Sequence, residues 1–116
     1  MRIEIQSPQF IKASEECRLQ AVLFNDSYES VAVSRNAFVG PSLKALTPGG
    51  YPYPESVEAT FGGPEEPLTL QPFTFYGRER IYSGLRPGEV EVIAYYRDPK
   101  RKIEISASER LRVEPG

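Results

Sequence analysis

The side chains that most often carry out enzyme chemistry are almost absent from this sequence, which has no histidine and one cysteine, Cys17. Histidine is the usual general base, the usual partner of a nucleophilic serine or cysteine, and a frequent metal ligand. In the run CRLQAVLF the thiol shares one strand face with Leu19, Ala21 and Leu23, so we expect a small buried side chain rather than a reactive thiolate. Most familiar hydrolase mechanisms are therefore excluded, and no catalytic residue is predicted.

Acidic side chains are the remaining candidates for acid–base chemistry. Glu15 is adjacent to Glu16, and Glu65 to Glu66; adjacent residues of a strand point to opposite faces, so neither pair is arranged to share a proton. The sequence contains no calcium-loop pattern and no glycine-rich phosphate loop. We expect solvated turn charges, no metal, no cofactor and no enzyme activity. The alternative from a different class is an enzyme that uses facing Asp and Glu carboxylates alone.

A basic run at a predicted turn is the first candidate contact surface. In YRDPKRKIE the turn carries the cationic side chains of Arg97, Lys100, Arg101 and Lys102. Such a turn can bind a phosphate or an acidic partner. The simpler alternative is that lysine and arginine keep a hairpin tip soluble and prevent its edge from aggregating.

A loop rich in tyrosine and proline is the second candidate contact surface. The stretch TPGGYPYPES, residues 47–56, alternates Tyr51 and Tyr53 with Pro52 and Pro54 directly after two glycines. Tyrosine offers a large amphipathic contact area for little lost conformational freedom, and proline stiffens a loop before it binds. The alternative is a crossover between sheets whose rings fold back over the core. Exposure of the two rings distinguishes a binding loop from a lid.

The elements that must position these loops are predicted to be short strands. Apolar residues recur with period two, and 11 prolines and 9 glycines separate the runs and leave almost no room for helices. In GEVEVIAYYRD, Val90, Val92, Ala94 and Tyr96 share one face, which is expected of a central strand. The other expected strands lie within 3–5, 17–23, 31–33, 57–61, 68–70 and 103–113, the last as one strand or two. The pattern predicts a two-sheet antiparallel sandwich in a single domain over residues 1–116.

Three stretches in order, VLFNDS, LTLQP and LRPGEVEVIAYYR, resemble bacterial immunoglobulin-like and fibronectin-like modules. In those modules a strand ends at an Asn-x-Ser turn, and a later Pro-Gly turn opens a strand of the form G-x-Y-x-V-x-A. The layout is similar, more distantly, to the bacterial intracellular proteinase inhibitor family. The likeness covers residues 17–97, with Val90 where such modules often have tyrosine and Phe73 after Pro72 where glycine is common. The resemblance implies an all-β, two-sheet antiparallel immunoglobulin-like sandwich of about seven to nine strands, and it leaves the ligand open.

Charge and hydropathy narrow the possible partners. The formal net charge is -2, with basic and acidic residues interspersed, so no field exists to hold nucleic acid or an acidic membrane. The N-terminus has no apolar run of signal-peptide length, and no segment approaches the ~20 apolar residues of a membrane span. A cytoplasmic location is expected, or an unknown one if the chain is part of a larger exported protein. The NDS sequence at Asn25 matches a glycosylation acceptor, but a strand-ending turn is expected there.

Taken together, these features predict a non-catalytic protein-interaction module that binds another protein through loops at the end of a β-sandwich. The first alternative is a proteinase inhibitor of the intracellular inhibitor type, which would present loops at one end of the sandwich. The second is a spacer domain of a larger surface protein.

Overall fold

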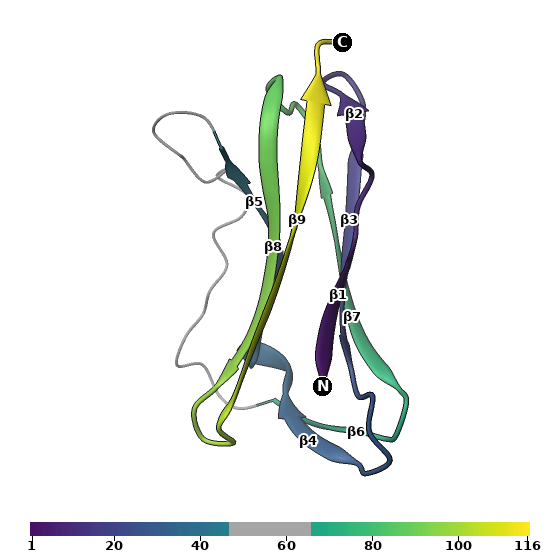
Figure 1. Cartoon of the computed structure of the whole chain (residues 1–116), viewed down its shortest axis with the longest axis vertical. Helices are drawn as coiled ribbons and strands as arrows, with labels where there is room; N and C mark the ends of the chain where they lie inside the picture. The colour runs from purple at the N-terminus through teal and green to yellow at the C-terminus, as the bar shows by residue number, and fades with distance from the viewer. Residues whose placement is uncertain (47–65) are drawn as a thin grey trace.

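The computed structural model describes residues 1–46 and 66–116, and over these residues the chain is all β (Figure 1). One three-residue 3-10 turn, η1 (Arg35–Ala37), interrupts the strands. In this part of the chain no helix is long and apolar enough to cross a membrane. The strands are β1 (Arg2–Gln6), β2 (Phe10–Lys12), β3 (Cys17–Phe24), β4 (Val31–Ser34), β5 (Phe38–Ala45), β6 (Pro67–Leu70), β7 (Phe75–Tyr82), β8 (Gly88–Asp98) and β9 (Ile103–Glu114).

The described strands form several sheets. β1, β3 and β7 hydrogen-bond in that order, β2, β9, β8 and β5 form a second sheet, and β4 pairs with β6. In Figure 1 the strands of the two larger sheets run along the length of the molecule, and β4 and β6 lie across one end. Buried side chains from both larger sheets share one cluster, in which Leu19 of β3 packs with Leu43 of β5 and Val92 of β8. This arrangement is compatible with a β-sandwich.

The core lies where the alternation of β3 and β8 predicts it. Successive side chains of a strand point to opposite faces, so every second residue of these strands enters the space between the sheets. β8 lies between β9 and β5, which confirms that it is a central strand. The residues whose alternation predicted the two strands are all buried: Cys17, Leu19, Ala21, Leu23, Val90, Val92, Ala94 and Tyr96.

The sequence pattern does not predict the strands β2, β5 and β7. β5 contains Gly40 followed by Pro41, a pair that usually indicates a turn. The register of β5 against β8 shifts between Val39 and Ser42, so the pair is accommodated as an irregularity within the strand. Gly40 has φ +112, and a Cβ at this position would lie 2.7 Å from the carbonyl oxygen of Ile93. Only glycine allows the two backbones to approach so closely.

One pairing departs from the antiparallel arrangement that the sequence predicts. β2 runs parallel to β9, with Ile11 opposite Val113. After β1, which belongs to the three-stranded sheet, the chain passes through residues 7–9 and continues in the four-stranded sheet. Pro8 lies in this link, where its missing N–H removes no ladder hydrogen bond. The segment 103–113 belongs to one strand, β9, and the expected strand 57–61 lies outside the described residues.

Candidate functional site

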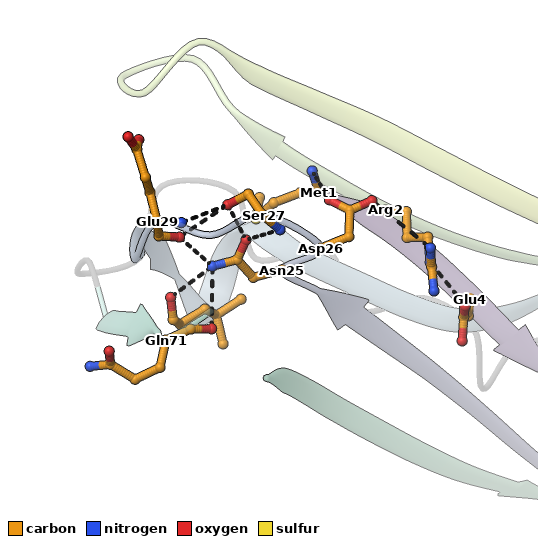
Figure 2. A network of polar contacts seen from close by, with 9 residues as sticks. Met1, Arg2, Glu4, Asn25, Asp26, Ser27, Glu29 and Gln71 are labelled. Carbon is orange, nitrogen blue, oxygen red and sulfur yellow. Dashed lines mark hydrogen bonds and ion pairs between the residues drawn. The ribbon is translucent and has the colours of Figure 1, made fainter. Parts of the chain in front are cut away.

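A buried asparagine joins the loop after β3 to the turn after β6 (Figure 2). Asn25 is 0% exposed. Its Nδ2 donates hydrogen bonds to the carbonyl oxygens of Glu29 (2.8 Å), Leu70 (3.0 Å) and Gln71 (3.2 Å). Its Oδ1 accepts hydrogen bonds from the backbone N–H (3.0 Å) and the hydroxyl (2.7 Å) of Ser27. The Asn-Asp-Ser turn therefore ends a strand, as expected, and the nitrogen that would carry a glycan is occupied by three backbone carbonyls.

The two joined loops hold a pair of aromatic rings in solvent. Tyr28 is 88% exposed and Phe73 is 50% exposed, and their ring centroids lie 5.0 Å apart with the planes at 82°. Phe73 has φ 59, in the left-handed region that a bulky side chain rarely adopts. Its backbone N–H donates to the carbonyl oxygen of Asn25 at 2.9 Å, which fixes this conformation. Phe73 is the residue that stands where the modules that the sequence resembles commonly have glycine.

Two further phenylalanines lie at the ends of the strands that meet this loop junction. Phe24 and Phe75 are register partners of β3 and β7, and Phe75 is 61% exposed. The backbone N–H of Asn25, which follows Phe24, donates to the carbonyl oxygen of Thr74 at 3.0 Å, so the ends of both strands meet at the loop junction. We call the exposed ring pair of Tyr28 and Phe73 the aromatic patch.

Ion pairs from Met1 and from Arg2 of β1 reach the same loop (Figure 2). The Met1 ammonium lies 2.9 Å from Oδ1 of Asp26, and Nη1 of Arg2 lies 3.9 Å from Oδ2 of the same carboxylate. Nε of Arg2 also lies 2.9 Å from Oε1 of Glu4, within β1. The hydrogen bond from the ammonium lowers the pKa of the Asp26 carboxyl below its ordinary value. The guanidinium of Arg2 also lies over the ring of Phe24, 4.7 Å from its centroid. Because these charges are partly exposed, they orient the loop more than they stabilise it.

The predicted basic turn is present between β8 and β9, and it contains a buried acid. Asp98 is 5% exposed, and its carboxylate accepts hydrogen bonds from the Tyr96 hydroxyl (2.7 Å) and from Nη1 (3.0 Å) and the backbone N–H (3.2 Å) of Arg101. Burial raises the pKa of Asp98, but the hydrogen bonds from Tyr96 and Arg101 outweigh it and hold the pKa below its ordinary value. Arg101 is therefore part of the internal structure of the turn.

The same network ties the turn to β4. The backbone N–H of Ser34 donates to the Tyr96 hydroxyl at 2.9 Å, and that hydroxyl in turn donates to Asp98. Burial raises the pKa of Tyr96 to about 12, so the phenol stays protonated and remains a donor at neutral pH. The other notable residue of the turn, Lys102, has φ 56, a second side chain in the left-handed region.

The structure describes one of the two contact surfaces predicted from the sequence. Arg97, Lys100, Arg101 and Lys102 gather around one turn, as expected. Tyr51, Pro52, Tyr53 and Pro54 lie outside the described residues, so the exposure of the tyrosine loop stays a prediction. Sequence reasoning did not identify the aromatic patch or Asp98. The signal for the patch was Phe73 itself, a bulky residue at a turn position where glycine is common.

Within the described residues, no group of three or more His, Cys, Asp or Glu side chains is placed to hold a metal ion. The adjacent glutamates Glu15 and Glu16 are exposed, as is Glu66. The carboxylate oxygen of Glu15 accepts a hydrogen bond from the backbone N–H of Lys12 at 3.0 Å. These three acids are thus surface turn charges, as expected from the sequence.

Cys17 is predicted to react slowly with thiol reagents in the folded protein. The residue is 0% exposed, and burial raises the pKa of its thiol, which disfavours the nucleophilic thiolate. Labelling with a maleimide or disulfide reagent, followed by mass spectrometry, should be fast only in denaturant. Rapid stoichiometric labelling of the native protein at neutral pH would contradict the assignment of Cys17 to the core.

Comparison with models of known protein families and with curated proteins finds no match for the chain. Its function is therefore inferred from the side chains that the loops present and from the way those loops are held.

Proposed function

We propose that the protein is a non-catalytic module that binds another protein through loops at the end of an immunoglobulin-like β-sandwich. The sheet orders β1-β3-β7 and β2-β9-β8-β5 support the immunoglobulin-like assignment, because the first strand is divided between two sheets that share a core. The observation that carries the functional proposal is Phe73, whose apolar ring is half exposed on a backbone with φ 59.

The backbone strain at Phe73 bears on function because it does not help the chain to fold. A non-glycine residue in the left-handed region raises the free energy of the folded state by roughly 1 to 2 kcal/mol. Burial of the ring does not compensate, since half of the side chain faces water. Residues in such conformations cluster at binding sites, where the surrounding structure holds them in place. A function for the ring at the surface accounts for its retention.

The ring pair has the properties of a binding hot spot. Aromatic side chains lose little conformational freedom on binding and dominate the energetics of many interfaces. The loops that carry Tyr28 and Phe73 are joined by the hydrogen bonds of Asn25, so the rings are positioned before a partner arrives. Preorganisation of this kind reduces the entropy lost on association.

Substitution of the patch separates binding from folding. Phe73→Gly should abolish or weaken partner binding by at least about tenfold, while the free energy of unfolding stays equal or rises by up to about 1 kcal/mol because glycine accepts the left-handed φ. The partner is first isolated from cell extract with the wild-type protein, identified and purified. Its affinity for each variant is then measured by isothermal titration calorimetry.

The matched control is Ile81→Ala, which removes an apolar side chain that is 49% exposed at the other end of β7. The control should bind with wild-type affinity. Equal affinities for the Phe73→Gly and Ile81→Ala proteins would show that the aromatic patch is not the binding site. Identification of the partner as a protease that the protein inhibits would instead favour the inhibitor function.

A further inference from the structure

We infer that the turn between β8 and β9 binds an acidic segment, rich in Asp and Glu, of the protein partner. This inference rests on the proposed function, because it adds a second contact to the same binding event. The turn joins β8 to β9, whereas the aromatic patch lies on the β3–β4 and β6–β7 connections, so each contact can be removed separately.

Local charge at the turn is opposite to that of the whole chain. Four of the 14 Lys and Arg residues fall within residues 97–102, although the chain has a net charge of -2. The single acid in this stretch, Asp98, is buried and paired with Arg101 at 3.0 Å. Arg97 and Lys102 are exposed, and the exposed acid opposite them across the hairpin is Glu104, the register partner of Arg97. The exposed surface of the turn therefore carries an excess of positive charge, which attracts carboxylates.

The cations border a small hollow with an apolar component. Its lining consists of Arg97, Asp98, Pro99, Lys102, Ile103 and Glu104. Pro99 and Ile103 can contact the methylene groups of an acidic side chain while Arg97 and Lys102 reach its carboxylate. The carboxylate of Glu104 repels a second carboxylate at its edge of the hollow. The hollow therefore accommodates one acidic side chain of an extended segment at a time.

Rigidity of the turn supports a binding role. The hydrogen bonds from Tyr96 and Arg101 to Asp98 hold the turn at its base. Lys102 occupies a left-handed conformation, with φ 56, where glycine or asparagine is less strained. A lysine in that place keeps a cation at the rim of the hollow at the expense of backbone strain.

The test uses an eight-residue peptide of alternating Asp and Glu with a fluorescent label, and fluorescence anisotropy at low ionic strength. The wild-type protein should bind this peptide saturably, and added salt should weaken binding because the charges are exposed. The double variant Arg97→Glu/Lys102→Glu should bind at least about tenfold more weakly. Lys12→Glu/Arg18→Glu is the matched control, because it makes the same change in net charge at exposed residues of β2 and β3, and it should bind nearly as the wild type does.

Lys102→Gly provides a second, independent measurement. It should raise the melting temperature, because glycine relieves the left-handed strain, and it should weaken peptide binding. Equal losses in the two double variants would mean that only the overall field attracts the peptide, which overturns the inference. Binding of inorganic phosphate or a phosphoserine peptide without binding of the Asp/Glu peptide would overturn it in favour of a phosphate site.

The outcome for the turn is distinguishable from that for the patch. Phe73→Gly should leave binding of the acidic peptide unchanged, since the ring lies on the β6–β7 turn. If the acidic peptide fails to bind while Phe73→Gly still loses the partner, this inference is wrong and the proposed function stands. If the peptide binds and Phe73→Gly keeps the partner, the site of the proposed function is wrong instead.

Discussion

Replacing Leu19 with alanine should lower the free energy of unfolding by about 2 to 5 kcal/mol, because a fully buried side chain is removed from a packed core. Leu19 is 0% exposed and packs in one cluster with Tyr82 of β7 and Leu43 of β5. Its truncation leaves a cavity between strands of both larger sheets, and neighbours held by two ladders can collapse only partly. Urea unfolding followed by circular dichroism at 25 °C measures the loss.

Ile81→Ala serves as the control for this change as well. Ile81 is a large apolar residue of β7 that is 49% exposed, so its truncation should cost less than about 0.5 kcal/mol. A loss at Leu19 no larger than the loss at Ile81 would place Leu19 at the surface and contradict the shared core. The slope of the unfolding free energy against urea concentration should be the same in the wild type, Leu19→Ala and Ile81→Ala if the substitutions change only stability.

Replacing Asn25 with alanine should lower the free energy of unfolding by about 3 kcal/mol or more, since several backbone carbonyls lose their donor at once. The carbonyl oxygens of Leu70 and Gln71 lie at the end of β6 and in the turn after it, and that of Glu29 lies in the loop after β3. Their separation should also displace Tyr28 and Phe73 and weaken partner binding. Thermal unfolding and calorimetry on the same samples measure both effects.

Asn25→Asp is the informative companion because it keeps the size and shape of the side chain. The second oxygen of aspartate cannot donate to the carbonyls, so at neutral pH this variant should be at least as unstable as the alanine variant. Ser27→Ala, which removes only the hydroxyl bonded to Oδ1, should lose about 1 kcal/mol. A nearly wild-type Asn25→Asp protein would mean that the amide does not hold the loops together.

The alternation of apolar residues was sufficient to predict the core strands because β3 and β8 each bury one face fully, while the other face, apart from Val22, is at least partly exposed. Cys17, Leu19, Val90 and Val92 show the alternation directly in the sequence. β7 does not show this alternation in the sequence. Its inward-facing side includes the half-buried Arg78 and Arg80, and a charged side chain is usually expected to point toward solvent. The bulge at Gly40 hides β5 in the same way, because a turn-like pair lies within a strand.

The candidate site was harder to predict because its key features depend on contacts between distant segments. Asn25 meets Leu70 across 45 residues of sequence, and no local pattern indicates that pairing. The basic turn was recognisable from composition alone. Its internal ion pair was not, since the burial of Asp98 depends on how β8 packs and on the hydroxyl of Tyr96.

The parallel pairing of β2 with β9 has a mechanical consequence. A pull on the two ends of the chain passes through β1 into β2 in one direction and through β9 in the other, so the two parallel strands are drawn past each other along their length. The hydrogen bonds from Ala13 N to Glu114 O (2.8 Å) and from Arg112 N to Gln9 O (3.1 Å) lie across that force. They are loaded together and must break together, whereas hydrogen bonds aligned with a pull open one after another. The three-residue pairing of β2 with β9 is thus loaded in shear, in series with the five-residue ladder of β1 with β3.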